Sequence, residues 1–417
     1  MNMQSIRSKQ SFSLATAAVL IFFMISNLAT FVLDFSGGVR GAASWIYFIF
    51  LAAIYALMVL TGKTSLFRRI FFVTFALLFV PSFMQNLIDA RGSIALSESE
   101  VINNQTPFCH LVIPITLIPA ALSRTIIFPA RLSGHYAAVY SMLGIWLTAT
   151  LMFGRGWCSW ICFYGGWDEG FSRLAKKRKI NLDNSGPKLR YFSFSMLIFI
   201  VLVSLATFSP VYCEWFCPFK AVTEFSEITD IKSYLATIVF IGLFLGLVIV
   251  MPILTKKRFQ CAVFCPFGAF QSLVDKVSIY RIRIDKNKCT GCMACVKACP
   301  TLSLSKERIL SDKDLPLLTC TKCGECISVC KNGAISYDYR HRLPQKWKEK
   351  SAALRLKLES SGKTSHKVFA YVLKTISELL SPAALFPFAA FTFGMVISSM
   401  FARDSIAQII TMITGIK

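Results

Sequence analysis

Long apolar segments separated by short polar ones make up most of the chain. Seven of these segments approach the roughly 20 residues that a helix needs to cross the hydrocarbon core of a membrane. They lie at about 12–34, 43–61, 70–88, 136–153, 191–209, 233–254 and 382–401. The pattern therefore predicts a mainly α-helical fold, a polytopic transmembrane bundle with about seven spans.

The segment between the third and fourth spans has a different pattern. Residues 91–135 contain an apolar run that is interrupted by three prolines and by Arg124. Proline removes a helical hydrogen bond, and a charge inside hydrocarbon is costly. We therefore expect an outer loop with a re-entrant or interfacial segment here, instead of a crossing helix.

A polar region interrupts the apolar pattern after the sixth span, and a basic linker follows it. On this basis the chain divides into N-terminal transmembrane helices, an outer loop, further transmembrane helices, a polar domain, a basic linker with a surface helix, and a C-terminal span with an interfacial tail. The expected boundaries are 1–90, 91–135, 136–270, 271–340, 341–381 and 382–417.

Composition supports a membrane protein. The 417 residues are 55% hydrophobic and have a mean hydropathy of +0.57, which is more apolar than a soluble chain of this size. The formal charge of +23 is compatible with nucleic-acid binding. The basic residues, however, stand in loops beside apolar spans, as the positive-inside rule requires. We expect membrane lipid, and no nucleic acid, as a partner.

The same basic residues predict the orientation of the bundle. Lysine and arginine are concentrated in the segments 1–11, 62–69 and 154–190, whereas 35–42 and 210–232 have little of this bias. All the basic segments fall on one side if six spans precede the polar domain. We therefore expect a multi-pass protein of the bacterial inner (cytoplasmic) membrane, with the polar domain 271–340 in the cytoplasm.

Within the polar domain, eight cysteines follow the spacing of bacterial-type ferredoxins. Two Cys-x2-Cys-x2-Cys-x3-Cys runs lie between Cys289 and Cys330. In such runs three close thiolates hold one [4Fe–4S] cluster and the fourth cysteine crosses to the other cluster. The prediction is an α+β ferredoxin domain with two clusters, one on Cys289, Cys292, Cys295 and Cys330 and the other on Cys320, Cys323, Cys326 and Cys299.

Zinc is the alternative for a cysteine-rich run. Structural zinc sites usually use two separated cysteine pairs, so two triplets with a trailing cysteine favour iron–sulfur clusters. Reduced thiolate ligands also suit a domain in a reducing compartment.

Three Cys-x3-Cys pairs follow predicted spans in the membrane half. Four-residue spacing places both thiols of a pair on one helical face. The pairs Cys158/Cys162 and Cys261/Cys265 fall on the predicted cytoplasmic side, where their four thiols match the complement of a third [4Fe–4S] cluster. Buried free cysteines are the structural alternative.

The remaining cysteines are expected on the opposite side. Cys109, Cys213 and Cys217 are three thiols, which His110 or His135 would have to supplement. An outer redox centre, a disulfide between Cys213 and Cys217, and a redox-active thiol pair all remain open.

At residues 136–335 the chain resembles a known family, the membrane-spanning polyferredoxins of the NapH type, and it is similar to the membrane half of NosR. The resemblance is carried by the Cys-x3-Cys motifs at Cys158/Cys162 and Cys261/Cys265 and by the two-cluster ferredoxin run, although Phe163 stands where the motif has proline. It implies electron transfer between the quinone pool or a cytoplasmic donor and a partner redox protein such as a flavoprotein or a periplasmic reductase.

The expected function is therefore electron transfer in the membrane, with two [4Fe–4S] clusters, a candidate third cluster and a candidate quinone site. A regulatory or maturation protein that uses its clusters for redox sensing or metal reduction is the alternative, and a self-contained metal reductase is a further one. The sequence has no Walker loop, no G-x-G-x-x-G before a helix and no Cys-x-x-Cys-His haem motif. An electron-transfer subunit is thus favoured over an enzyme that completes its own reaction.

Overall fold

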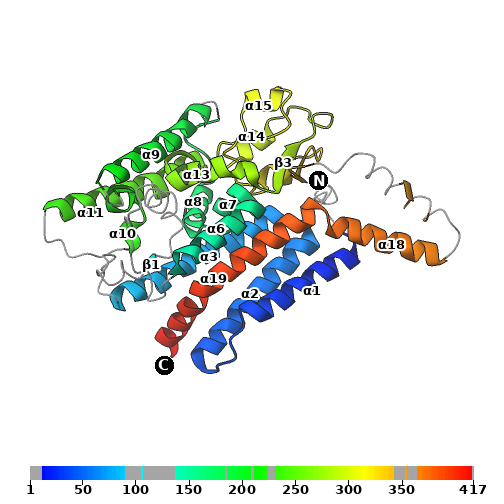
Figure 1. Ribbon diagram of the computed structural model, residues 1–417, viewed down its shortest axis with the longest axis horizontal. Coiled ribbons are helices and arrows are strands. Elements are labelled where there is room, and N and C mark those ends of the chain that lie inside the picture. Colours follow the sequence, from blue (N-terminus) through cyan, green and yellow to red (C-terminus); the bar gives the residue numbers. More distant parts are fainter. Residues whose placement is uncertain are drawn as a thin grey trace.

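The structure is a computed structural model, and Figure 1 shows that helices dominate it. It describes residues 12–89, 105–106, 137–183, 186–207, 211–223, 231–341, 353–354, 358 and 364–415. A helical bundle with a small β-containing domain at one end confirms the predicted fold class.

The first group of helices combines both ends of the chain. α1 (Leu14–Phe31), α2 (Gly38–Thr61) and α3 (Thr64–Asp89) pack with α19 (Pro382–Thr414), which lies between them in Figure 1. Aromatic side chains fill the contact, and the ring centroids of Phe71 and Phe391 are 4.8 Å apart. Gly62 ends α2 in the left-handed region, at φ 65°, and so permits the tight turn into α3.

The second group of helices follows in the middle of the chain and appears in green in Figure 1. Its longer elements are α6 (Val139–Phe153), α8 (Phe163–Leu174), α9 (Gly186–Thr207), α11 (Ile231–Leu243) and α13 (Pro266–Val274). The shorter ones are η3 (Gly154–Gly156), α7 (Trp157–Trp160), η4 (Tyr212–Phe216), α10 (Lys220–Thr223), η5 (Phe244–Val250), α12 (Met251–Thr255), η6 (Gln260–Phe264) and η7 (Asp275–Val277).

Five helical segments of the described chain are long and apolar enough to cross a membrane. They are Leu14–Phe31, Gly38–Thr61, Lys188–Thr207, Ile231–Thr255 and Pro382–Ser399. The other two predicted spans are helical but are not in this set. α6 has only 15 residues, about 22 Å at 1.5 Å per residue and less than the ~30 Å hydrocarbon core. The side chains in the last part of α3 lie mostly outside the described residues.

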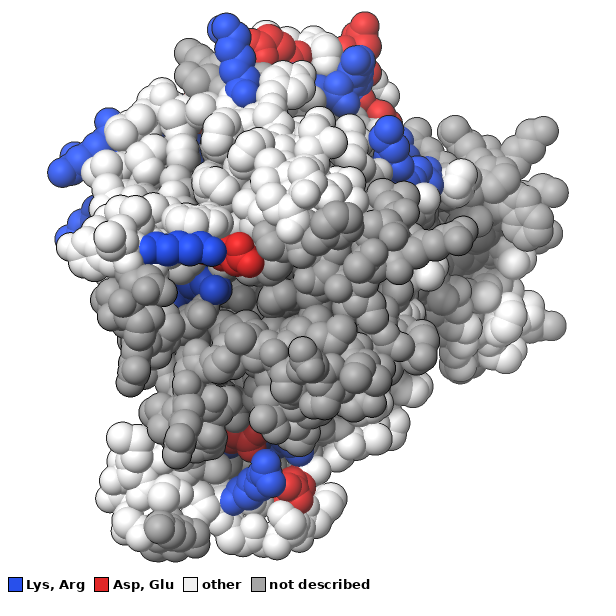
Figure 2. Space-filling model, turned by 60° about the vertical axis from the view of Figure 1, so that its left-hand side comes forward, with Lys and Arg blue, Asp and Glu red and all other residues white. Residues whose placement is uncertain are grey.

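Large apolar side chains face outward on these spans. Phe22, Ile49 and Ile198 are more than half exposed, which in water would leave a large apolar surface uncovered. On the face drawn in Figure 2 most described atoms belong to uncharged residues, and Lys and Arg stand in small groups, several beside Asp or Glu. The protein is therefore a membrane protein, and its charge is not gathered into one patch on this face.

The C-terminal tail, which was expected to be an amphipathic segment at the interface, continues the last helix. α19 runs without a break to Thr414 and ends at Gly415 (φ 69°). Asp404 pairs with Arg40 of α2 at 2.9 Å. The chain has no helix breaker between Ala402 and Thr414, so the span simply extends into the tail.

The polar domain is a small α+β unit built on one antiparallel strand pair. β3 (Tyr280–Ile284) pairs with β4 (Ile335–Tyr339), with Ile282 opposite Tyr337. Alternate β3 side chains, at Tyr280, Ile282 and Ile284, point into the core, as the two-residue period of a strand requires. The helices between the strands are α14 (Ala294–Ala298), α15 (Lys306–Leu310) and α16 (Glu325–Ser328).

Two predicted segments lie largely outside the described residues. Of the expected outer loop 91–135 the structure describes only β1 (Gln105–Thr106), which pairs with β2 (Ala137–Ala138). Of the expected linker 341–381 it describes mainly α18 (Thr364–Leu379), where the Glu378 carboxylate accepts hydrogen bonds from the Ser13 amide and the Thr16 hydroxyl at 2.9 and 2.8 Å.

Contacts at one end of the bundle hold the polar domain. Arg69, just after the 62–63 turn, pairs with Glu325 of the polar domain at 2.5 Å. The Tyr339 hydroxyl of the polar domain donates to the Leu380 carbonyl, next to the start of α19. The basic 62–69 and 154–183 segments therefore lie at the end of the bundle that carries the polar domain.

Candidate iron–sulfur sites

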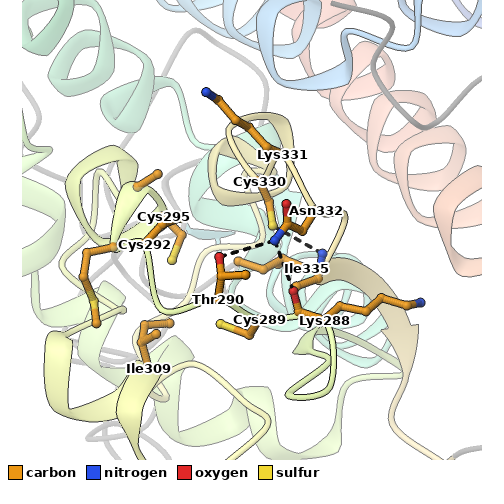
Figure 3. Close-up of a pocket in the computed structure, with 13 residues that line it drawn as sticks. Lys288, Cys289, Thr290, Cys292, Cys295, Ile309, Cys330, Lys331, Asn332 and Ile335 are labelled. Carbon is orange, nitrogen blue, oxygen red and sulfur yellow. Dashed lines mark hydrogen bonds between the residues drawn. The ribbon is translucent and has the colours of Figure 1, made fainter. Parts of the chain in front are cut away.

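The first cysteine set of the polar domain lines one pocket. Figure 3 shows Cys289, Cys292 and Cys295 around this pocket together with Cys330 from the second run. Cys299, the fourth cysteine of the first run, does not line it. The Asn332 amide links the two runs at the rim by donating to the Thr290 hydroxyl at 3.3 Å. The fold therefore brings Cys330 of the second run to the first three cysteines of the first run.

The two cysteine runs share one backbone shape. In the first run Gly291 and Met293 have φ values of 67° and 58°, and in the second run Lys322 and Gly324, at the same positions, have 52° and 80°. Left-handed residues on both sides of the second cysteine turn the chain around a central point. The fourth cysteine of each run accepts a backbone N–H bond, Cys299 from Ser303 at 3.2 Å and Cys330 from Ala334 at 3.3 Å. Such N–H···S bonds are what thiolate ligands require.

The second set lies deeper than the first. Cys323 and Cys326 are buried and Cys320 is half-buried, whereas Cys292 of the first set is exposed. Burial raises the pKa of the Cys323 thiol to about 11, with the charge of Arg68 acting in the opposite direction. Cys299 lies close enough to Cys320 and Cys326 to influence their pKa values electrostatically. The first set thus faces solvent and the second faces the bundle.

In the membrane half the structure brings two cysteine pairs to a single cavity. Cys158 and Cys162 line it together with Cys261 and Cys265. The first pair belongs to α7 and the residues after it, and the second belongs to η6, a short π-helix. Sequence spacing predicted that these four thiols would meet, and the two helical turns place them around one space.

The second cysteine of each pair has the same backbone conformation. Cys162, Cys217 and Cys265 each end a helical turn with ψ between 107° and 116°, and Cys299 of the polar domain has ψ 112°. The Cys265 thiol accepts the Gly268 amide at 3.4 Å. Phe163 in place of proline after Cys162 therefore leaves this turn unchanged.

The chemistry of the cavity fits an iron–sulfur cluster. Within the described ranges no three His, Cys, Asp or Glu side chains are close enough to hold a single metal ion. A cubane spreads four thiolates over four irons, so its ligands lie further apart than those of one ion. Burial raises the pKa of Cys158, and Arg155 and Arg258 act in the opposite direction. Two buried cations therefore lie beside these thiols, and a bound cluster would add the charge of its iron to theirs.

The arginines of this cavity are functional candidates that the sequence analysis treated only as topology signals. Arg155 and Arg258 are fully buried. The Arg258 Nη2 donates to the Cys261 Sγ at 3.3 Å and to the Cys158 carbonyl at 2.5 Å, and the Arg155 Nη2 donates to the Cys261 carbonyl at 3.3 Å. A signal was available, because each arginine precedes the first cysteine of its pair by three residues, whereas Cys213 has Pro210 at that position.

A buried charge network lies between this cavity and the polar domain. The Glu169 carboxylate of α8 accepts two bonds from Arg68 of α3, at 2.5 and 3.0 Å, and both side chains are fully buried. Burial alone would raise the pKa of Glu169, but the charges of Arg68 and Arg258 lower it to about 2. The carboxylate stays ionised at neutral pH and holds the guanidinium groups in place.

Direct hydrogen bonds join the membrane cavity to the second cysteine set. The Arg258 amide donates to the Pro300 carbonyl at 2.8 Å, next to Cys299. The Trp160 indole N–H, between Cys158 and Cys162, donates to the Lys322 carbonyl at 3.4 Å. Each motif of the cavity therefore contacts the loops of the second set.

Two lysines complete this junction from opposite sides. The Lys257 Nζ donates to the Cys299 carbonyl at 2.9 Å and to two further carbonyls at the end of α14. The Lys322 Nζ donates to the Phe153 carbonyl at the end of α6 and to the Asp275 carboxylate, both at 2.8 Å. These bonds fix the polar domain on the bundle.

The third pair does not lie apart from the cavity. Cys213 and Cys217 belong to η4 and its end, and their neighbours Tyr212 and Phe219 line the same cavity as the other two pairs. The Phe216 ring is 6.1 Å from Phe199 in the middle of α9, so the chain folds back along this helix after its end. The structure therefore places the turn that carries this pair beside the inner cysteines, where the sequence analysis had expected it on the opposite side. Cys109, His110 and His135 lie outside the described residues.

Comparison with protein families finds 4Fe-4S domains at both groups of cysteines. A 4Fe-4S dicluster domain matches residues 281–331, which contain both cysteine runs. A 4Fe-4S binding domain matches residues 135–181, 189–230 and 237–287, and each match contains one Cys-x3-Cys pair. The chain is a membrane polyferredoxin of the NapH type. Its two kinds of 4Fe-4S domain support bound iron–sulfur clusters.

Individual relatives are similar over part of this polyferredoxin. An uncharacterized protein of Methanocaldococcus jannaschii is 30% identical over 44% of this chain and 64% of its own. The ferredoxin-type protein NapH of Haemophilus influenzae is 25% identical over 60% of this chain and 77% of its own. The putative electron transport protein YccM of Escherichia coli is 26% identical over 48% and 55%. The match therefore covers less than two thirds of the first of these relatives, and no solved structure matches the chain.

Proposed function

We propose that this polyferredoxin relays electrons between a soluble redox partner and a partner or quinone at the membrane. The observation that carries the proposal is the pair of hydrogen bonds that joins the membrane cavity to the second cysteine set, from the Arg258 amide and the Trp160 indole. Adjacent redox sites in one rigid unit are what a relay requires. An unconnected sensor domain has no need of this junction.

The ligand sets follow the grouping of the cysteines. We assign Cys289, Cys292, Cys295 and Cys330 to cluster 1 and Cys320, Cys323, Cys326 and Cys299 to cluster 2. We assign Cys158, Cys162, Cys261 and Cys265 to cluster 3. Each bound cluster supplies a one-electron redox centre, and the surrounding N–H groups and cations set its potential.

Exposure gives the relay an order. Cys292 is exposed at the outer surface of the polar domain, whereas the second set is buried toward the bundle. A soluble partner can therefore approach cluster 1, and the path continues through cluster 2 to cluster 3. The family resemblance implies a flavoprotein or a periplasmic reductase as the partner. Both are compatible with this order of the three clusters.

A vesicle assay tests the proposal. The full chain is reconstituted anaerobically into vesicles that contain a lipid-soluble quinone, and dithionite is added outside as the electron donor. We expect quinol to form as two electrons from dithionite and two protons from water reach each quinone, at a rate proportional to the protein present. If the clusters become reduced but no quinol forms, the proposed electron transfer to quinone is contradicted and a sensing or maturation role is favoured.

The proposed location is the bacterial inner membrane, with the polar domain in the cytoplasm. The basic segments at the polar-domain end support this orientation through the positive-inside rule. A reporter that is active only in the periplasm should be inactive when inserted after Lys177 and active after Ser36, which are exposed loop residues at the two ends. Reporter activity after Lys177 and none after Ser36 would contradict this orientation.

A further inference from the structure

Arg258 occupies a position in the membrane half that is unusual for a cation. Its side chain is fully buried, next to the cavity lined by the four cysteines. The Nη1 donates to the Ser159 hydroxyl at 2.7 Å, and the Nη2 donates to the Cys158 carbonyl and the Cys261 thiol. One guanidinium therefore contacts both cysteine pairs.

The surroundings hold the guanidinium in this orientation. A Cβ atom at Gly165 would lie 2.2 Å from the Arg258 Nη2, so only glycine leaves room there. The Arg258 guanidinium lies 5.5 Å from the centroid of the Phe72 ring, and its Nη1 is 3.7 Å from the Glu169 carboxylate. The group has no path to solvent by simple rotation, because its contacts come from α3, α7 and α8 together.

A fixed, buried cation beside a ligand sulfur changes the energy of reduction. A [4Fe–4S] core with four thiolates is negatively charged, and one more electron makes it more so. The Coulomb attraction of a buried cation is stronger than that of an exposed one, because the effective dielectric constant is lower. A hydrogen bond to the sulfur acts in the same direction.

We propose that Arg258 sets the reduction potential of cluster 3 and holds it more positive than its four thiolates alone would allow. The inference rests on the proposed ligation of cluster 3 by Cys158, Cys162, Cys261 and Cys265. Because the Arg258 amide also bonds the Pro300 carbonyl beside Cys299, the same residue stands between clusters 2 and 3. A more positive cluster 3 draws electrons inward from the polar domain.

The test is a redox titration by EPR of the anaerobically purified full chain and its variants. In Arg258→Gln we expect the ratio of reduced to oxidised cluster 3 at a fixed potential to fall at least tenfold, which is about 59 mV for a one-electron couple. The signals of clusters 1 and 2 should stay in place. Arg258→Lys, which keeps the charge, should recover part of the shift.

The control is Lys256→Gln, which removes a positive charge two residues away, where the ammonium donates to the Lys176 carbonyl in an exposed bond. It should leave the cluster 3 potential unchanged. If Arg258→Gln keeps its full iron content and the midpoint potential of cluster 3 does not change, the inference is overturned. It is also overturned if Lys256→Gln shifts that midpoint as much as Arg258→Gln does. If Arg258→Gln loses iron, a second neutral variant, Arg258→Met, decides, and an unchanged midpoint potential of cluster 3 in that variant refutes the proposal.

Failure of the underlying function would be seen differently. A parent protein with only about eight iron atoms per chain would show that cluster 3 does not exist. In that case no third EPR signal would be present to titrate. A third EPR signal whose midpoint potential is the same in the parent protein and in Arg258→Gln would refute this inference and leave the proposed function standing.

Discussion

Replacing Cys158 and Cys261 together by serine should remove about four iron atoms per chain and stop quinol formation. The two residues supply half of the ligands proposed for cluster 3, one from each pair, so neither pair can hold the cubane alone. The clusters of the polar domain have separate ligands and should remain. Iron and acid-labile sulfide analysis of anaerobically purified protein, alongside the vesicle assay, measures both effects.

A double variant of the third pair is the matched control. Cys213→Ser with Cys217→Ser makes the same chemical change beside the same cavity, but outside the proposed ligand set. We expect it to retain the iron of the parent protein. An equal loss of iron in both double variants would show that the third pair also holds iron, and an unchanged iron content in Cys158→Ser, Cys261→Ser would remove the basis for cluster 3.

The second large effect is expected from Cys299→Ala, which should destroy cluster 2 and spare cluster 1. Cys299 follows the first run in the sequence but lies near Cys320 and Cys326, and it does not line the pocket of the first run. The relay should also stop, because cluster 2 is the step between the surface and the bundle. EPR of the reduced variant identifies which signal is missing.

Cys330→Ala provides the reciprocal experiment. It should remove cluster 1 and leave cluster 2, since Cys330 lines the pocket with Cys289, Cys292 and Cys295. Loss of the Cys289-side cluster in Cys299→Ala, with the other cluster intact, would show that each run holds its own cluster and that the ligation is not crossed.

Much of the arrangement follows from spacing alone. Thiolate ligands that wrap a cubane must be close in sequence, so the two ferredoxin runs can be recognised without a fold. The spans can also be predicted from the length of each apolar segment, because the fixed thickness of the hydrocarbon core sets how many residues a crossing helix needs. The meeting of Cys158/Cys162 with Cys261/Cys265 was also predictable, because both pairs follow spans that end on one side.

The buried cations were not predictable from charge counts. Arg68, Arg155, Lys257 and Arg258 count equally with surface lysines in the positive-inside rule, yet all four are buried. What places them there is pairing: Arg68 with Glu169, Lys257 with the carbonyls at the end of α14, and Arg258 with Ser159 and two cysteines. Glu169 is about 100 residues from Arg68, and Cys299 is about 40 residues from Lys257, so no local pattern reveals these two pairings. Only the three-residue spacing from Arg155 and Arg258 to the next cysteine was visible in the sequence.

The third pair shows the limit of span-by-span topology. Counting spans sends Cys213 to the far side of the membrane, because α9 is long enough to cross. The chain after α9 instead folds back, and the tilted rings of Tyr164 and Phe219 lie beside the cavity with their centroids 4.1 Å apart. Three aromatic side chains in the Tyr212–Phe216 turn favour this inward packing over a solvated loop.

The central claim is that the membrane half holds a cluster of its own, and the iron content of the whole chain tests it most directly. Full-length protein, purified anaerobically in detergent, is analysed for iron and acid-labile sulfide per chain. Three cubanes predict about twelve of each. A value of about eight, with EPR signals from the two ferredoxin clusters only, would contradict the account.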